Sequence, residues 1–262
     1  MRNAITVAWA IALVVIAPSV ARAASDGTPG LAVEINAHIQ VRVYNAAVMP
    51  AADQAVALRA AATILAAAGI GTSWLPCGDA ASDPAATACS TPLDASELSV
   101  RLVRLPGTAS ARGELQLGYS LVDTAVGAGT LATIYADRVA WLAGEAGADM
   151  PTLVGFAIAH EIGHLLLGTN AHSGTGLMRA VWSRAELRRN EAADWLFGPS
   201  EAARMRSSVL RLEGLRSSQR DFHAAACSSS VDAASASATD TSECTGDTVV
   251  ASIRAVAARA DR

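Results

Sequence analysis

The spacing of apolar and polar positions predicts strands in the first half of the chain. Residues 32–45 alternate between the two classes and are rich in β-branched side chains, which favours a first strand. Residues 50–68 are rich in alanine and are followed by Gly69, so we expect a helix that ends there. Further strands are expected over residues 72–75, 97–105, 115–122 and 130–139.

A long apolar segment in the middle of the chain predicts a buried helix. Residues 152–159 are apolar on every side of a helix, which is typical of a helix in the core. Asp149 supplies an N-cap, and Pro151 falls in the first turn, where its missing amide proton costs little.

Two further helices are expected in the last third of the chain. Ser183 and Glu186 have the spacing of a capping box, which predicts a helix through about Trp195. Pro199 begins another helix, through about Leu215. This order of strands and helices predicts an α+β domain with helices packed on a twisted mixed sheet.

The N-terminal residues have the composition of a signal peptide. Arg2 supplies a positive charge, residues 5–17 are apolar, and residues 21–23 read Ala-Arg-Ala, so we expect residues 1–24 to be removed on export. The apolar stretch is too short to span a membrane. We therefore expect a secreted or periplasmic protein without membrane association after cleavage. One domain would occupy residues 25–215, followed by a Ser/Ala-rich loop or tail over residues 216–262.

The expected export predicts the state of the four cysteines. They are Cys77, Cys89, Cys227 and Cys244, and an even number in an oxidising compartment favours disulfide bonds. Proximity in the sequence favours pairing Cys77 with Cys89 and Cys227 with Cys244, while two other connectivities remain open. No C-x-x-C pair is present, which argues against a zinc site made of cysteines.

The charge of the chain bears on its partners. The formal net charge is -4 and the isoelectric point is near 5.7, which argues against nucleic acid, because phosphate binding needs a basic surface. Several arginines lie between residues 184 and 216, and we expect them on the solvated faces of the C-terminal helices.

Three of the five histidines lie in one run of thirteen residues, HEIGHLLLGTNAH. On a helix His160 and His164 leave the same face one turn apart, so both can bind one metal ion. Glu161 lies beside the first of them and is placed to accept a proton from water. Gly168 can end the helix with a positive φ, so that His172 can return as a third ligand. Three nitrogen ligands leave one position open, as catalytic zinc sites do.

This run resembles the signature HExxHxxGxxH of the metzincin clan of zinc endopeptidases, and matrixin-like enzymes most closely. The matching residues are His160, Glu161, His164, Gly168 and His172, and residues 173–178 resemble the run to the methionine turn. The resemblance implies a five-stranded mixed sheet whose antiparallel edge strand pairs with substrate. It also implies that Met178 packs beneath the imidazoles.

The chain departs from the family pattern in two places. Gly168 comes one residue later than in the signature and His172 comes two residues later, so the loop to the third ligand is wider. No tyrosine follows Met178. The alternative third ligand is Glu191, which lies in a segment, N-E-x-x-D, that resembles the gluzincins.

The resemblance implies a zinc metallopeptidase in which Glu161 acts first as general base and then as general acid. Its substrate would be a protein or peptide, and we expect a monomer. Two alternatives stay open: an exported zinc-binding module without turnover, and a zinc hydrolase of a non-protein amide such as a cell-wall link.

Overall fold

The structure, a computed structural model, describes residues 37–78, 88–94, 96–105 and 116–234, with the backbone alone for residues 219–220 and 222–234. The expected signal peptide, the first residues of the first expected strand and Cys244 lie outside the described residues. The strands are β1 (Ala37–Asn45), β2 (Ile70–Cys77), β3 (Glu97–Val103), β4 (Gly118–Asp123) and β5 (Ala128–Tyr135). The helices are α1 (Ala51–Ala67), α3 (Ala136–Ala146), α4 (Met150–Leu167), α5 (Arg184–Arg189), the 3-10 helix η1 (Ala192–Trp195) and α6 (Pro199–Ala234).

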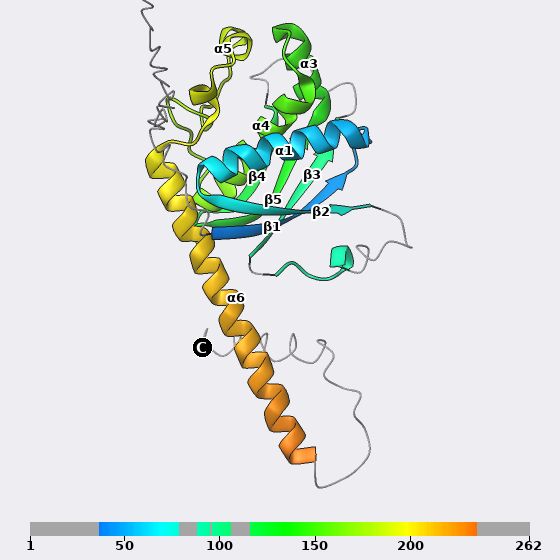
Figure 1. Cartoon of the computed structure of the whole chain (residues 1–262), viewed down its shortest axis with the longest axis vertical. Coiled ribbons are helices and arrows are strands. Elements are labelled where there is room, and N and C mark those ends of the chain that lie inside the picture. The colour runs from blue at the N-terminus through cyan, green and yellow to red at the C-terminus, as the bar shows by residue number, and fades with distance from the viewer. Residues whose placement is uncertain (1–36, 79–87, 95, 106–115, 235–262) are drawn as a thin grey trace, which may run out of the picture. The chain divides into compact units, whose positions relative to one another are not determined.

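The five strands form one mixed sheet in the order β2-β1-β3-β5-β4 (Figure 1). All neighbouring pairs are parallel except β4 and β5, which are antiparallel, so β4 is an antiparallel edge strand. The predicted α+β class with a mixed sheet is therefore confirmed. The edge position of β4 matters for the site, because one side of its backbone has no neighbouring strand among the described residues.

The helix α4 lies in the core, where it packs against α1, β4 and β5. A Cβ atom at Gly155 would lie 2.4 Å from the carbonyl oxygen of Ala57, so this glycine lets α4 approach α1 closely. α4 is also long and apolar enough to span a membrane by composition, but 72% of it is buried within the fold. It is thus the apolar core helix that the sequence predicted.

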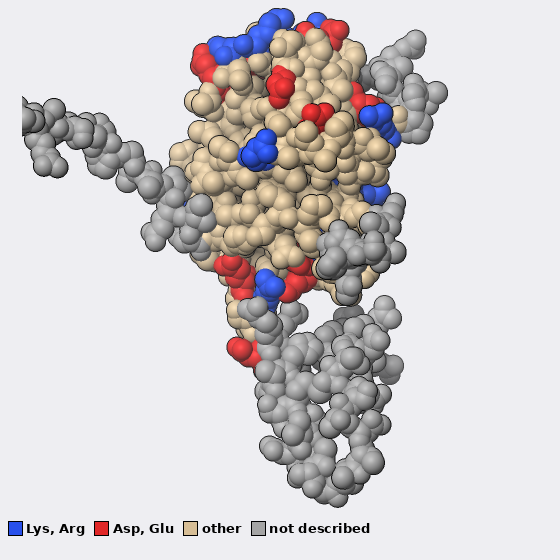
Figure 2. Space-filling model, turned by 45° about the vertical axis from the view of Figure 1, so that its right-hand side comes forward, with Lys and Arg blue, Asp and Glu red and all other residues tan. Residues whose placement is uncertain are grey.

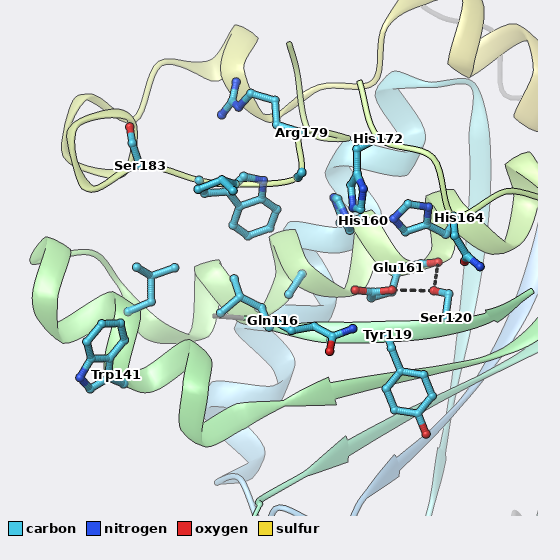
Figure 3. A pocket seen from close by; sticks show the side chains of 18 of the residues that line it. Gln116, Tyr119, Ser120, Trp141, His160, Glu161, His164, His172, Arg179 and Ser183 are labelled. Atoms are coloured by element: carbon cyan, nitrogen blue, oxygen red, sulfur yellow. Dashed lines mark hydrogen bonds between the residues drawn. The ribbon is translucent and has the colours of Figure 1, made fainter. Parts of the chain in front are cut away.

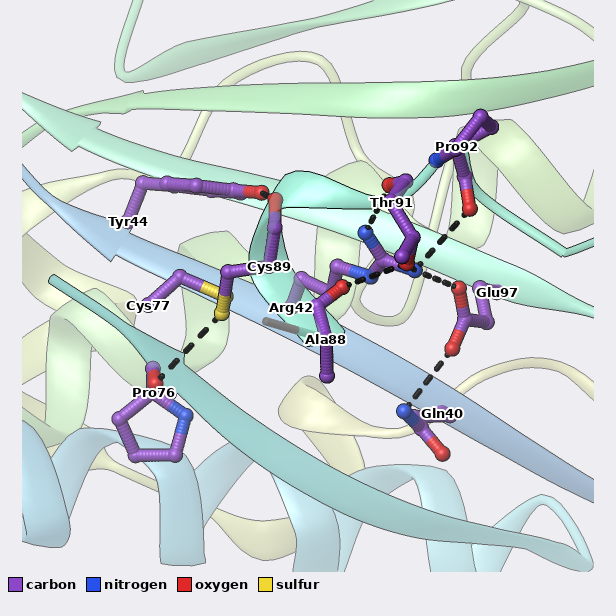
Figure 4. The surroundings of a disulfide bond; sticks show 10 residues. All are labelled: Gln40, Arg42, Tyr44, Pro76, Cys77, Ala88, Cys89, Thr91, Pro92 and Glu97. Carbon is purple, nitrogen blue, oxygen red and sulfur yellow. Dashed lines mark hydrogen bonds and ion pairs between the residues drawn. A yellow bond between two sulfur atoms is a disulfide. The ribbon is translucent and has the colours of Figure 1, made fainter. Parts of the chain in front are cut away.

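A disulfide bond and a buried ion pair hold the loop that precedes β3 (Figure 4). Cys77 bonds to Cys89, as predicted. Arg42, in β1, contacts Glu97 at 2.5 Å and donates to the carbonyl oxygen of Thr91 at 2.7 Å. Both charged side chains are almost fully buried. The segment from Cys89 to Pro92 is therefore attached to β2 by the disulfide bond and to β1 by the hydrogen bonds of Arg42.

The structure corrects two predicted boundaries. The fifth strand was expected over residues 130–139, but it ends at Tyr135 and α3 follows at once. Val139, Leu142, Ala143 and Ala146 are buried, at a spacing that places one face of a helix on the core. The helix expected from the capping box ends at Arg189, because Asn190 takes a left-handed conformation with φ 47°, and η1 follows.

The last helix is longer than expected, because α6 continues through residues 216–234, where we predicted a loop. This segment contains no glycine or proline and is rich in alanine, so nothing in its sequence ends the helix. Arg206 ties α6 to the end of α1 by donating to the carbonyl oxygen of Ala68 at 2.7 Å. Arg216 pairs with Asp94 at 2.7 Å.

Charged groups are sparse on the face seen in Figure 2, most of which is uncharged. Basic and acidic side chains adjoin at the upper edge and at the lower end of this face. This mixture fits exposed ion pairs such as Arg184 with Glu145 at 2.7 Å.

Candidate metal and catalytic site

Three of the predicted site residues, His160, Glu161 and His164, lie in the C-terminal part of α4. The Asp149 side chain caps the first turn of this helix by accepting from the Thr152 amide at 3.0 Å. Gly168 ends it in a left-handed conformation with φ 65°. The last two turns carry His160, Glu161 and His164, and all three side chains are buried.

The three histidines come together at one point. The ligand nitrogens of His160, His164 and His172 all lie within 4.8 Å of one another. The Nε2 atoms of His160 and His164 are 3.1 Å apart. His172 is exposed and reaches the other two from the loop after α4 (Figure 3). The wider spacing of this loop thus still allows the third imidazole to join the cluster.

The other ring nitrogens of the two helical histidines are held by backbone carbonyls. His160 Nδ1 is 2.9 Å from the Leu177 oxygen, and His164 Nδ1 is 2.8 Å from the Thr169 oxygen. Because a carbonyl only accepts, each Nδ1 carries the proton, and both Nε2 atoms present lone pairs to each other. Two lone pairs at that distance repel unless a cation lies between them. Nitrogens that share a tetrahedral zinc are about 3.3 Å apart, so the observed separation fits such an ion.

Burial keeps the helical histidines neutral. It lowers the pKa of His160 to about 4, with a smaller contribution from the neighbouring His164 and His172. Burial also lowers the pKa of His164. Neutral imidazoles are the form that binds a metal, so at neutral pH these two nitrogens need lose no proton first.

The segment that follows His172 packs against α4. The Ser173 amide donates to the Met178 carbonyl at 2.8 Å, and the Leu177 amide donates to the Leu196 carbonyl at 2.9 Å. Met178 is fully buried, and a Cβ atom at Gly163 would lie 2.7 Å from its sulfur. The methionine therefore packs on α4 between the turns that carry the two histidines.

The side chain of Glu161 extends from α4 toward the edge strand β4. The Ser120 hydroxyl donates to its Oε2 atom at 2.6 Å (Figure 3). Burial raises the pKa of Glu161 to about 7, and the Ser120 hydrogen bond opposes this shift. The carboxyl is thus poised to exchange a proton near neutral pH.

A cavity of about 800 Å³ opens onto these groups. The residues that line it and that the sequence did not single out come from β4, α3 and the segment after Met178, and include Gly118, Ser120, Trp141, Val181 and Trp182. Trp141 is 52% exposed and Val181 62%, so the cavity wall includes exposed apolar surface. Nothing in the sequence distinguishes these residues, because their place in the cavity wall depends on the fold.

Other candidate residues lie away from this cluster. Glu191 pairs with Arg189 at 3.0 Å, and its side chain is 62% exposed. It does not line the cavity. His38 contacts Ser73 at 3.1 Å on the opposite edge of the sheet. The side chains of His223 and Cys227 lie outside the described residues, so the expected Cys227–Cys244 bond does too. Among the described residues, His172 is therefore the third ligand candidate that the fold brings to His160 and His164.

No protein-family profile matches the chain, and a search of curated proteins finds no significantly similar sequence.

Proposed function

We propose that the protein is a secreted, zinc-dependent endopeptidase of metzincin-like type. The observation that carries the proposal is the convergence of three histidine nitrogens, one buried carboxyl and an open cavity beside the edge strand β4. The five-stranded mixed sheet, with β4 antiparallel at its edge, has the form that the resemblance implies. The Cys77–Cys89 bond fits an exported chain, since disulfides persist in oxidising compartments.

The zinc ligands in this proposal are the Nε2 atoms of His160 and His164, together with a ring nitrogen of His172. When bound, zinc supplies Lewis acidity toward a carbonyl oxygen and a water molecule. The Leu177 and Thr169 carbonyls keep the two helical imidazoles in the tautomer that can bind it. Zinc is favoured among metals because nitrogen ligands with one open position suit it.

Glu161 moves the proton in the proposed reaction. Its carboxylate accepts a proton from the attacking water and then gives it to the nitrogen of the leaving amine. A group that both takes and gives a proton works best with a pKa near the working pH, and burial raises the pKa of Glu161 in the metal-free chain to about 7. Its position in the cavity wall lets the proton reach both atoms.

An extended peptide is the substrate in this proposal. Gly118, Tyr119 and Ser120 of β4 line the cavity, and this strand has a free edge within the sheet. A peptide main chain can hydrogen-bond to such an edge as an additional strand. This pairing would hold the scissile bond along β4 and next to the histidines.

Purified protein incubated with casein and with cell-wall fragments, each with and without a chelator, tests the proposal. We expect zinc-dependent cleavage of casein that the chelator abolishes and added zinc restores. Cleavage of cell-wall fragments alone would instead assign a non-protein amide as substrate. Zinc binding without cleavage of either would indicate a binding module.

A further inference from the structure

Ser120 makes two short contacts, both to Glu161. Its hydroxyl lies 2.6 Å from Oε2 of the carboxyl group and 2.7 Å from the main-chain oxygen of the same residue. Both Glu161 oxygens are acceptors, and Ser120 has one hydroxyl proton, so the hydroxyl donates to one oxygen at a time or to both in a bifurcated hydrogen bond. Ser120 therefore joins the edge strand β4 to both the side chain and the backbone of Glu161 (Figure 3).

Gly118 bounds the same side chain from a second position on the strand. A Cβ atom there would lie 2.8 Å from Glu161 Oε1 and 3.0 Å from its Cγ. Positions 118 and 120 face the same side of β4, as alternation requires, and Tyr119 points away from Glu161 (Figure 3). Two alternate positions of one strand thus limit how the Glu161 side chain can turn.

These contacts give the two carboxyl oxygens of Glu161 different hydrogen bonding. Oε2 accepts from Ser120, whereas no hydrogen bond to Oε1 is formed within the described part of the chain. A glutamate has three side-chain torsions, and its last one is broad, so an unheld carboxyl can rotate and exchange its oxygens. The hydrogen bond to Ser120 removes that freedom.

We propose that Ser120 is a positioning residue that fixes the carboxyl group of Glu161 and leaves Oε1 to take the proton from water. The kinetic part of this inference rests on the proposed function. The structural part does not, because it concerns only how Glu161 is held.

Crystal structures of Ser120→Ala and Ser120→Thr test the structural part. We expect the carboxyl group of Glu161 to occupy more than one orientation in the alanine variant and a single one in the threonine variant, which keeps the hydroxyl. Thermal unfolding shows whether each variant is folded. One unchanged orientation of Glu161 in a folded Ser120→Ala chain would overturn the inference, whatever its activity.

Rates of zinc-loaded protein on casein test the kinetic part. For Ser120→Ala we expect kcat to fall about 10-fold, the loss typical of one hydrogen bond to a charged group, with KM nearly unchanged. Ser120→Thr should restore most of kcat. In a Glu161→Gln background Ser120→Ala should cause no further loss, because its effect passes through the carboxylate.

Ser73→Ala is the matched control, since Ser73 lies on the opposite edge strand β2 and bonds to His38. It should leave kcat and KM unchanged. An equal loss from Ser120→Ala in the unmodified chain and in the Glu161→Gln background would assign Ser120 another role and overturn the inference. The two proposals can fail separately. If the unmodified protein shows no zinc-dependent cleavage, but the Glu161 carboxyl group takes more than one orientation in Ser120→Ala, the proposed function is wrong and the positioning role of Ser120 is supported.

Discussion

His160 and His164 face each other through unprotonated nitrogens, with the two Nε2 atoms 3.1 Å apart and each Nδ1–H bound to a backbone carbonyl. Neutral protein groups do not gain from such a contact. A cation bound by both nitrogens would remove the repulsion between their lone pairs, so these side chains could hold a metal ion. The arrangement depends on the Leu177 and Thr169 carbonyls, which the loop after α4 supplies.

The third ligand can be tested by a matched pair of variants. We expect His172→Ala to weaken zinc binding by more than about 100-fold, because loss of a direct ligand should exceed the 10–100-fold effect of a lost supporting contact. Glu191→Ala should leave zinc affinity unchanged, since Glu191 is exposed and pairs with Arg189. Competition with a chromogenic chelator measures both. The reverse order of effects would move the third ligand to Glu191.

The pH dependence of stability reports the burial of Glu161. Its pKa is raised from 4.5 to about 7 in the folded chain, so its contribution to stability is full below about pH 4.5 and is lost as the pH rises through 7. In zinc-free protein, Glu161→Gln should therefore gain stability over the unmodified chain across this range. The difference should reach on the order of 3 kcal/mol. Urea unfolding at several pH values measures it, and a difference that does not change with pH would contradict the expected burial effect.

Replacing Gly118 and Gly144 by alanine should change the stability of the fold in opposite directions. Gly118→Ala places a Cβ atom 2.7 Å from the Thr133 carbonyl oxygen and 2.8 Å from Glu161, so we expect a loss of about 1–3 kcal/mol and reduced activity. Gly144, in α3, has open space around the added atom. Gly144→Ala should stabilise the chain by about 0.5–1 kcal/mol, because alanine favours the helix. Thermal and urea unfolding compare the two, and equal effects would be inconsistent with the described packing of β4.

The buried pair of Arg42 and Glu97 should dominate the stability of the loop before β3. Arg42→Ala leaves Glu97 buried without its cation, so we expect a loss of about 3–5 kcal/mol. The double variant Arg42→Met, Glu97→Leu removes both charges and should lose much less. Denaturant unfolding measures both. If the double variant were no better than Arg42→Ala, the cost would lie in the loop contacts of Arg42 and not in the unpaired charge.

Local chemistry in the sequence predicted the parts of the fold that depend on neighbouring residues. The cap at Asp149, the end of α4 at Gly168 and the capping box of Ser183 all follow from residues a few positions apart. The histidine cluster was predictable for the same reason, since His160 and His164 share one helical face. The Cys77–Cys89 bond closes a short loop and was predicted from proximity.

Features that depend on distant contacts were missed. The strand β5 and the helix α3 meet without a break between Tyr135 and Ala136, so no turn signal separates them. Ser120 and Gly118 belong to no motif, and their roles arise because β4 lies beside Glu161. Such pairings come from the order of strands in the sheet, which alternation along the chain does not specify.

The central claim is zinc-dependent peptide hydrolysis with Glu161 as the base. Its most direct test compares zinc content and casein hydrolysis in the unmodified chain and in Glu161→Gln. We predict the same zinc content in both and a loss of about 100-fold or more in kcat for the variant, as expected when a general base is removed. Equal zinc content with an unchanged rate would contradict the account.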